Sequence, residues 1–392
     1  MSESSIQGVG VLSDGLRGHL SQSRGVAEWL RRDFGVEGKE FDVPRLVGWR
    51  RWQALKLRAL TLRRGNPATA LRWLAASSGI PLLESVKIWA QDQGMDLRRI
   101  LFLSAGSAAA PFCLALARHL GARCVTLMTP SVLGTAPFDA AVVPRHDAPV
   151  PSPWTLVTLG APNAIVPQAL AEAGEELLRR FPAGGPEGEG EVWERWAVLL
   201  GGDDGNYRLS PRWMERSVGA LLSAAKARGA VLYITTSRRT STEAEEALLR
   251  SVASSSAVRL CLLASRDPWN PVPGLLGAAH RVFCTEDSVS MVSEALSGGH
   301  RLGLLRVERR GGLRGWWGHA GTKLVRWGVW GEGALGGAIR FDALFEEFFR
   351  RGYAVECGPD PEAWPWDRVG RFDTPPPNEA RRAAAWLMGL WP

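Results

Sequence analysis

Short apolar runs alternate with helical stretches along most of this chain, and this alternation restricts its fold more than any other feature. The first apolar run, at 8–12, ends in Ser13-Asp14-Gly15, and a helical pattern with apolar Val26 and Leu30 follows it. Strands that alternate with helices in this way form a parallel sheet with helices on both faces. Further strand candidates of the first half lie at 99–103, 123–128, 139–143 and 154–158.

Between the two halves of the chain the alternation stops and then starts again. Residues 182–191, PAGGPEGEGE, are rich in Pro, Gly and Glu and almost free of apolar side chains, which is typical of an exposed connection. We therefore predict two α/β domains, at 1–185 and 192–372, followed by a helical tail at 376–392. Strand candidates of the second half lie at 196–200, 230–235, 258–263, 281–284 and 301–305.

Composition excludes several classes of protein. Apolar residues make up 45% and charged residues 22% of the 392 residues, which is an ordinary globular balance. No stretch approaches 18 uninterrupted apolar residues, which excludes a spanning helix, and the start of the chain lacks the pattern of a secretory signal. The five cysteines are scattered and odd in number, which argues for a reducing compartment. Neither they nor the six histidines show the spacing of a zinc site.

Basic residues and tryptophan are both in excess, with a net charge of +7 and 18 tryptophans. A chain of this kind can bind nucleic acid through phosphates and base stacking, or it can lie on an anionic membrane surface with indole rings among the headgroups. Codon usage in a GC-rich genome would produce the same bias. Nucleic acid ranks last, because the acid-free basic segment is a single stretch and no known reader module accompanies it.

That basic segment, residues 43–83, contains eight basic residues and no acid. Its run at 47–64, VGWRRWQALKLRALTLRR, predicts a helix in which leucines alternate with arginines, and we favour a helix that lies on anionic lipid. The alternative is a solvated helix that packs its leucines on the sheet. The stretch at 313–331 is also aromatic and basic and could add to the surface. The predicted membrane-contacting residues are Trp49, Arg50, Arg51, Trp52, Lys56, Arg58, Arg63 and Arg64.

Ligands of parallel α/β sheets bind at the carboxyl ends of the strands, and four loops there carry polar side chains. In the first loop, at 13–19, His19 or Asp14 is a candidate general base, although Asp14 could instead only cap the following helix. The second loop, at 201–210, places three glycines around two aspartates and could cradle a phosphate or a sugar. It matches neither the dinucleotide-binding glycine pattern nor the Walker loop, which weakens nicotinamide and ATPase functions.

The third and fourth loops each precede a helical pattern. The third, TSRRT at 236–240, combines hydroxyls with two arginines, which suits either a diphosphate site or a capped turn with surface arginines. The fourth, at 285–299, gathers acidic and hydroxyl side chains, and Glu294 lies four residues past Ser290, on about the same helix face. A carboxylate there can accept hydrogen bonds from a ribose whose phosphate lies at the helix N-terminus. The alternative is an N-capped amphipathic helix.

Five blocks of the sequence, in this order, resemble the signature blocks of the mitochondrial fission, or elongated-mitochondria, protein family. The first block differs from the family's pattern, which is closer to DGKPGHENQ, but it keeps Gly18, His19 and Gln22. An NPY-like segment of the family appears as an Asn-Pro-Val sequence that begins at Asn270. The blocks span roughly residues 9–310 and are SDGLRGHLSQSRGVAEWL, LMTPSVLGTAPFDAAVVPRHD, LLGGDDGNYRLS, TTSRRTSTEAEEALLR and WNPVPGLLGAAHRVFCTEDSVSMVSEALSGG.

This family is similar to GT-B glycosyltransferases, especially the lipid-linked N-acetylglucosaminyl transferase of cell-wall synthesis. The resemblance implies an α/β fold with two Rossmann-like domains that face a cleft. The nucleotide sugar would lie on the C-terminal domain, 192–372, and the acceptor and the membrane on the N-terminal domain, 1–185. The last helix, within 376–392, would cross back onto the N-terminal domain.

The resemblance also implies the roles of individual residues. The catalytic residues would be His19 and Asp14. The acceptor side would comprise Gly18, Gln22 and Gly106. The nucleotide-sugar site would comprise Gly201, Gly202, Ser237, Arg238, Arg239, Thr240, Asn270, Asp287, Ser288, Ser290, Met291 and Glu294.

These observations predict a membrane-surface glycosyltransferase that moves a sugar from a nucleotide-diphosphate sugar of the UDP type to a lipid-linked or envelope glycan acceptor. Helix N-termini at 237–240 and 287–290, with an arginine, would stabilise the leaving diphosphate, so we expect neither a metal nor another cofactor. The expected location is the cytoplasm, at the inner face of the cytoplasmic membrane. Two alternatives are a non-catalytic membrane adaptor for organelle or cell division, and a nucleotide-sugar epimerase.

Overall fold

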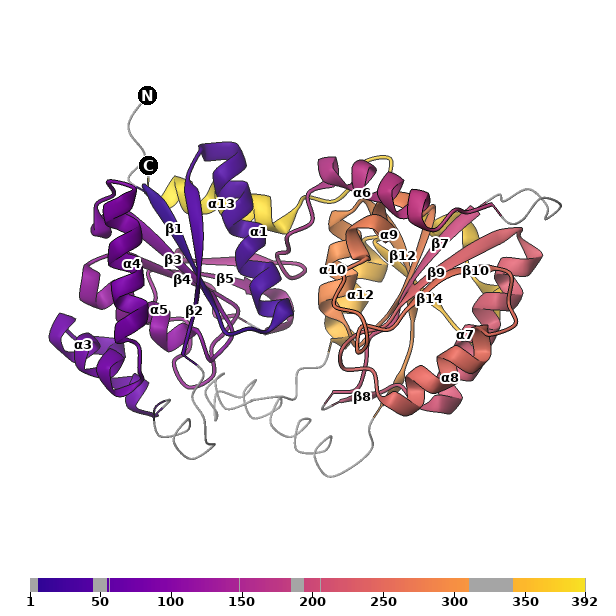
Figure 1. Cartoon of the computed structure of the whole chain (residues 1–392), viewed down its shortest axis with the longest axis horizontal. Coiled ribbons are helices and arrows are strands. Elements are labelled where there is room, and N and C mark those ends of the chain that lie inside the picture. The colour runs from indigo at the N-terminus through magenta and orange to yellow at the C-terminus, as the bar shows by residue number, and fades with distance from the viewer. Residues whose placement is uncertain are drawn as a thin grey trace. The chain divides into compact units, whose positions relative to one another are not determined.

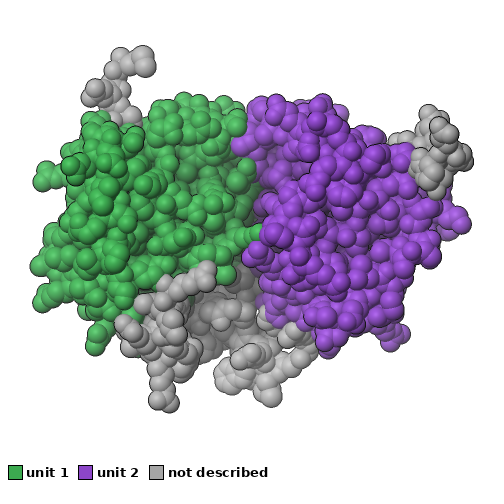
Figure 2. Space-filling view, viewed as in Figure 1, with its two compact units in different colours: residues 1–164, 318–339, 377–392 green, residues 165–317, 340–376 purple. Residues whose placement is uncertain are grey.

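The computed structural model describes residues 6–44, 55, 57–147, 149–184, 194–204, 206–309 and 341–391. They form two compact units, which Figure 2 colours separately. The first unit contains 6–164 and 377–391, and the second contains 165–309 and 341–376. Each unit is built on a parallel sheet with helices on both faces (Figure 1), so the predicted α/β class with two Rossmann-like domains is confirmed.

The sheet of the first unit has its strands in the order β2-β1-β3-β4-β5-β6, and all neighbours are parallel. Its strands are β1 (Gly8–Ser13), β2 (Glu37–Asp42), β3 (Ile100–Ala105), β4 (Arg123–Leu127), β5 (Ala140–Pro144) and β6 (Thr155–Thr158). Its helices are α1 (Arg17–Phe34), η1 (Ala59–Arg64), α3 (Pro67–Ala76), α4 (Ile80–Asp92), η2 (Leu97–Arg99), α5 (Ala110–Leu120), η3 (Arg145–Asp147) and α13 (Glu379–Leu390).

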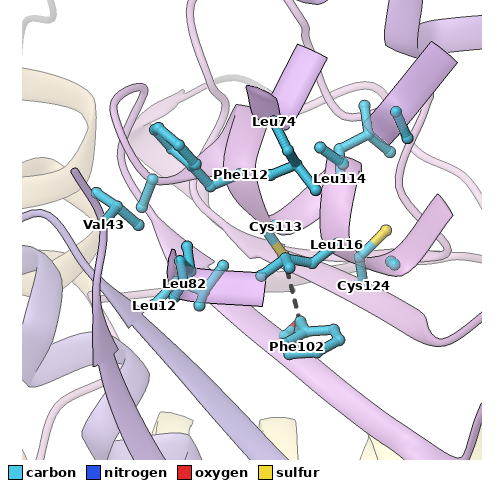
Figure 3. Packing of buried hydrophobic residues seen from close by; sticks show 14 of the residues in the cluster. Leu12, Val43, Leu74, Leu82, Phe102, Phe112, Cys113, Leu114, Leu116 and Cys124 are labelled. Atoms are coloured by element: carbon cyan, nitrogen blue, oxygen red, sulfur yellow. Dashed lines mark hydrogen bonds between the residues drawn. The ribbon is translucent and has the colours of Figure 1, made fainter. Parts of the chain in front are cut away.

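The core of the first unit is centred on α5. Its residues 110–117, APFCLALA, are all buried, because the helix lies between the sheet and α3 rather than at the surface. Figure 3 shows Phe112, Cys113 and Leu116 among side chains of the strands and of α3, with the Cys113 Sγ 3.5 Å from the carbonyl oxygen of Phe102. A helix that is apolar on all sides is typical of such an enclosed position.

The sheet of the second unit has the order β10-β9-β7-β11-β12-β14, again with parallel neighbours, and β15 pairs with β12 in the antiparallel sense. Its strands are β7 (Glu194–Leu199), β9 (Ala230–Thr235), β10 (Val258–Leu262), β11 (Arg281–Thr285), β12 (His300–Leu305), β14 (Ala354–Cys357) and β15 (Gly370–Arg371), with β8 (Tyr207–Arg208) and β13 (Glu308–Arg309) as a separate pair. Its helices are α6 (Pro167–Arg180), α7 (Pro211–Ala227), α8 (Thr242–Val252), α9 (Val272–Ala278), α10 (Val289–Ser297), α12 (Asp342–Arg350), η5 (Pro361–Ala363) and η6 (Trp366–Arg368).

The division into units differs from the predicted boundary near 185. Helix α6, assigned by the sequence to the first domain, belongs to the second unit. It packs on α9 so closely that a Cβ placed on Gly277 would lie 1.9 Å from the carbonyl oxygen of Leu170. The last helix, α13, belongs to the first unit, where Arg381 forms an ion pair of 2.7 Å with Asp33 of α1.

Candidate functional site

Each sheet has one point at which successive strands of the chain go to opposite sides. In the first sheet, β2 lies on one side of β1 and β3 on the other. In the second sheet, β9 and β10 lie on one side of β7, and β11 lies on the other. Loops diverge at the carboxyl ends of strands at such switch points, and ligands of open α/β sheets bind there. The predicted site residues follow β1 and β3 in the first unit and β7, β9 and β11 in the second, except for Asn270, which follows β10.

At the second switch point the loops after β7 and β11 are in backbone contact. The amide of Gly201 donates to the Thr285 hydroxyl at 2.7 Å, and the amide of Gly202 donates to the Asp287 carboxylate at 2.8 Å. A Cβ on Gly201 would lie 2.1 Å from Asp287 Oδ2, which leaves no room for a side chain. The two glycines are therefore needed for close packing. Their amides hold Thr285 and Asp287, and the predicted role in cradling a phosphate or a sugar stays a prediction.

The loop after β9 closes on itself and on the β7 loop. The Thr240 hydroxyl donates to the Gly201 carbonyl at 2.5 Å and accepts from the amide of Ser237 at 3.0 Å. The Ser237 hydroxyl in turn accepts from the amide of Arg239 at 3.0 Å. Ser237 and Thr240 are both buried. The hydroxyls of this TSRRT turn are thus engaged within the protein.

The N-terminus of α8, which follows this turn, is not an anion site. Ser241 caps the helix, accepting a hydrogen bond from the amide of Ala244, and Glu243 and Glu245 lie in the first turn. Carboxylates at this end already interact favourably with the helix dipole and would repel a phosphate. Of the two helix tips predicted to share a diphosphate, the tip after 237–240 is therefore the less suited to an anion.

Asp287 holds the arginine of the TSRRT turn in place. Its side chain is 0% exposed, and its Oδ2 accepts from Arg239 Nη2 at 3.1 Å, while the Arg239 side chain is 41% exposed. Burial raises the pKa of Asp287, against the lowering effects of Arg239 and the Gly202 amide. Asp287 thus positions Arg239 from a buried site, and its predicted part in substrate binding stays a prediction.

The N-terminus of α10, directly after Asp287, is different. Its N-cap residue Ser288 makes no side-chain capping hydrogen bond, and the first turn contains no acid. Ser290 and Met291, in that first turn, are both partly exposed. Uncapped amides and the positive end of a nine-residue helix favour an anion such as a phosphate. Of the two predicted tips, this one keeps the required chemistry.

The remaining residues predicted to bind the nucleotide sugar lie around these loops. Glu294 is partly exposed, one turn into α10 beyond Ser290. Arg238 is exposed beside Arg239. Asn270 is exposed, and its side-chain oxygen accepts from the amide of Val272 at 3.2 Å, so that it closes the turn before α9.

At the first switch point, His19 and Asp14, which the sequence offered as alternative general bases, form a pair. His19 Nδ1 lies 2.8 Å from Asp14 Oδ2, and the other oxygen of Asp14 accepts from the amide of Leu16 at 3.0 Å. Burial alone would raise the pKa of Asp14, but the hydrogen bond and charge of His19, with the Leu16 amide, outweigh it and the pKa is lowered. An ionised Asp14 therefore holds the imidazole of His19 in place.

Gly106, after β3, fits beneath the ring of His19. It has φ +81°, and a Cβ there would lie 2.3 Å from His19 Cε1, so the loop needs glycine to accommodate the imidazole. Gly18 lies in the first turn of α1, while Gln22 is buried deeper in that helix. Of the predicted acceptor-side residues, Gly18 and Gly106 thus lie at the loop edge and Gln22 lies in the interior.

Two features of the sites were missed from the sequence. Thr285, the last residue of β11, binds the Gly201 amide, and the only signal for it is a hydroxyl at the end of an apolar strand. His146 and Asp147 form a second His–Asp pair, directly after β5, with 3.7 Å between Nε2 and Oδ1. They fall inside one of the family-like blocks, which was the available signal.

The predicted membrane segment is only partly described. Trp49, Arg50, Arg51, Trp52 and Lys56 lie outside the described residues. The described arginines Arg58, Arg63 and Arg64 are exposed. Of the leucines in this segment, Leu55 and Leu62 are buried, whereas Leu57 is 61% exposed and Leu60 is also exposed.

The described residues show neither a membrane-spanning helix nor a cluster of metal ligands. None of the helices there is both long and apolar enough to cross a bilayer. Among the same residues, no three His, Cys, Asp or Glu side chains gather in a way that could hold a metal ion.

The sequence profile described as mitochondrial fission ELM1 matches residues 17–324. The chain belongs to this family. The matched range includes His19 and the loops at 201–202, 237–240 and 285–294, and it begins just after Asp14. The resemblance derived from the sequence blocks is therefore confirmed. A comparison with curated proteins gives no match.

Solved structures of similar fold include enzymes of nucleotide-sugar chemistry, by their titles. A putative UDP-N-acetylglucosamine 2-epimerase from Listeria monocytogenes is 12% identical, with a TM-score of 0.49 over 97% of this chain and 88% of that one. The UDP-GlcNAc 2-epimerase from Neisseria meningitidis bound to UDP-GlcNAc is 12% identical, with a TM-score of 0.42 over 88% and 98%. The glycotransferase of kitacinnamycin is 12% identical, with a TM-score of 0.44 over 99% and 94%.

Proposed function

We propose that this protein is a glycosyltransferase that takes a nucleotide-diphosphate sugar, of the UDP type, as its donor. The observation that carries the proposal is the uncapped N-terminus of α10 at the second switch point, next to an arginine that Asp287 holds in place. A diphosphate placed there would receive backbone amides and a guanidinium, and both stabilise the charge that a leaving nucleoside diphosphate acquires.

The residues around α10 support a nucleotide rather than a bare phosphate. Glu294 lies one turn inside the helix, on about the same face as Ser290, so its carboxylate can accept hydrogen bonds from the ribose hydroxyls. Arg238, exposed at the neighbouring loop, would supply a second forked donor to the diphosphate. We propose that these donors supply the charge stabilisation without a metal ion.

The first unit would supply the base. In the proposed reaction an acceptor hydroxyl attacks the anomeric carbon of the donor sugar, and the bond from that carbon to the diphosphate oxygen breaks. His19 takes the proton of the hydroxyl, and the nucleoside diphosphate leaves with the bonding electron pair. Asp14, with its lowered pKa, stabilises the imidazolium that forms.

We further propose that the acceptor is lipid-linked and that the protein works at the inner face of the cytoplasmic membrane. Leu57 and Leu60 are exposed beside the basic side chains of Arg58, Arg63 and Arg64. Apolar side chains among arginines, in a segment without acids, suit insertion into an anionic bilayer surface. Sedimentation with anionic vesicles, compared between the wild type and a Leu57→Gln, Leu60→Gln variant, tests this part. Equal sedimentation of the two would count against it.

The donor proposal is tested by melting the protein with UDP and with a panel of nucleotide sugars. A ligand at 100 times its Kd should raise the melting temperature by about 5–10 °C. Glu294→Ala should abolish the shift, whereas Glu246→Ala, on an exposed position of α8, should keep it. No shift with any nucleotide sugar would contradict the proposal. Conversion of the donor sugar without an acceptor would instead identify an epimerase.

A further inference from the structure

The segment 127–147 resembles a family block, yet the proposed function leaves it unused. It crosses the carboxyl edge of the first sheet twice, in the loop 128–134 after β4 and in η3 after β5. Because β4 and β5 are neighbours, the two loops lie side by side at that edge. The segment therefore lies at the end of the sheet where ligands bind.

The second His–Asp pair occupies this edge. The side chains of His146 and Asp147 are only 9% and 5% exposed. Asp147 Oδ2 accepts from the amide of Thr129 at 3.2 Å, which ties η3 to the loop after β4. Burial lowers the pKa of His146 and, despite the effects of His146 and the Thr129 amide, raises that of Asp147. The surroundings thus disfavour a net charge on either group.

Two buried oxygens at this edge lack hydrogen-bond partners within the described residues. They are Oδ1 of Asp147 and the hydroxyl of Thr129. Buried polar atoms are nearly always hydrogen-bonded in folded proteins, because leaving one unpaired is unfavourable. Two such atoms on residues already joined by a hydrogen bond indicate a site that a further hydrogen-bonding group would complete.

The loop after β4 is also strained. Met128 has φ 105° and Val132 has φ 75°, a region that side-chain-bearing residues rarely adopt. The strain at Met128 is held by the bond from its amide to the Val142 carbonyl, at 2.9 Å. Ser131 binds the hydroxyl of Ser107 through both its amide and its hydroxyl, at 2.8 and 2.9 Å. Strain of this kind persists only where the surrounding structure holds it, and it clusters at functional sites.

We propose that Asp147, Thr129 and the strained loop 128–134 form a binding site for the hydroxyl groups of a neutral sugar. The proposal rests on the proposed function, since it assigns this sugar as the acceptor. Ser107, which anchors the loop, directly follows Gly106, and Gly106 lies beneath His19. A sugar at this site would therefore be close to the base.

The chemistry of the site favours a sugar over other ligands. A hydroxyl can donate to Asp147 Oδ1 and accept from the Thr129 hydroxyl at the same time, which satisfies both unpaired atoms. A phosphate would be repelled by the carboxylate. A metal ion would find too few ligands, because no group of three suitable side chains exists among the described residues. An ammonium ion would place a charge where burial disfavours one.

Methionine methyl groups provide a separate reporter for each site. The chain has six methionines, of which Met128 lies in the proposed sugar loop and Met291 in the first turn of α10. The full-length protein labelled with ¹³C at the methionine methyls is titrated with methyl glycosides of glucose, galactose and N-acetylglucosamine, and separately with UDP and inorganic phosphate. We expect a glycoside to shift the Met128 signal and UDP to shift the Met291 signal.

Thr129→Val is the informative variant. It replaces an unpaired buried hydroxyl by a methyl group, so it should melt no lower than the wild type. It should nevertheless weaken glycoside binding by about tenfold, the effect of one lost hydrogen bond. Asp147→Asn should weaken it as well, and Thr155→Val, on β6 of the same sheet, should leave it unchanged.

The outcomes separate this inference from the proposed function. If UDP shifts Met291 while no glycoside shifts Met128, or if Thr129→Val binds glycosides as the wild type does, the sugar site is overturned and the donor site stands. If inorganic phosphate alone shifts Met128, the sugar site is likewise overturned. If a glycoside shifts Met128 and UDP fails to shift Met291, the sugar site is supported and the transferase is not.

Discussion

The two switch points of this molecule have the same topology but opposite chemistry. At the first, a titratable pair, His19 and Asp14, lies at a partly open loop edge. At the second, the glycine loop, the TSRRT turn and Asp287 close on one another, and what remains for a ligand is an uncapped helix end beside Arg239. One edge is suited to moving a proton and the other to holding a negative charge. The same sheet architecture thus gives two different sites through the side chains of its loops.

Of the two edges, the second has the closer packing, and it should respond more strongly to an added methyl group. In Gly202→Ala the new Cβ would lie 2.1 Å from the carbonyl carbon of Arg239, so backbone must move. We expect a loss of about 3 kcal/mol in unfolding free energy. The control is Gly219→Ala in α7, where no atom lies within 4 Å of the new Cβ. It should gain about 0.5–1 kcal/mol, because glycine is unfavourable within a helix. Urea denaturation measures both changes.

The same substitution at the first edge should act on the base instead. In Gly106→Ala the new Cβ would lie 2.3 Å from the His19 ring, and a side chain can turn away where backbone cannot. We expect a loss of about 1–2 kcal/mol from the positive φ, together with at least about a 10²-fold loss of transfer activity as the His–Asp pair separates. The comparison between the edges fails if both alanine variants lose the same stability and keep their activity.

The strands and the loops that carry the sites follow from the sequence, whereas contacts between residues far apart in the chain do not. Apolar runs identify strands such as β3 and β11, and the five-residue spacing of Asp14 and His19 places both at one loop. The exposed edge strand β2, with the sequence EGKEFD, carries no such pattern and was missed. The role of Asp287 depends on a contact with Gly202, 85 residues away, and a sequence of hydroxyl and acidic residues does not reveal which way each points. For the same reason, the sequence does not reveal that Ser241 caps α8 whereas Ser288 makes no capping bond at α10.

Acid titration should distinguish Asp14 from Asp287, because their ionisation has opposite effects on the stability of the fold. The pKa of Asp14 is lowered in the folded protein from 3.8, so its ionised form stabilises the fold above that pH, and this contribution is lost as the pH falls through the folded pKa. The pKa of Asp287 is raised from the same value, so its ionisation opposes folding at neutral pH, and this penalty disappears as the pH falls through the raised pKa towards 3.8.

Urea denaturation of Asp14→Asn and Asp287→Asn between pH 3 and pH 7 measures this difference. The advantage of the wild type over Asp14→Asn should shrink as the pH falls. As the pH falls through the raised pKa of Asp287, the wild type should gain unfolding free energy relative to Asp287→Asn. This change should occur at higher pH than the change seen with Asp14→Asn. Parallel pH profiles for the two variants would show that the two edges do not differ in the electrostatic sense inferred here.

The smallest expected effects come from the two helix ends of the second edge, and they decide which amides serve a ligand. Ser241 caps α8, so Ser241→Ala should cost about 1 kcal/mol of stability and leave UDP binding unchanged. Ser288 makes no capping bond at α10, so Ser288→Ala should change stability by less than about 0.5 kcal/mol. It should nevertheless weaken UDP binding by about 3–10-fold, through the loss of one hydroxyl contact to the diphosphate. Melting curves with and without UDP measure both quantities on the same samples. Equal losses of stability in the two variants, with no change in UDP affinity, would mean that α10 is capped like α8 and that its free end has no part in binding.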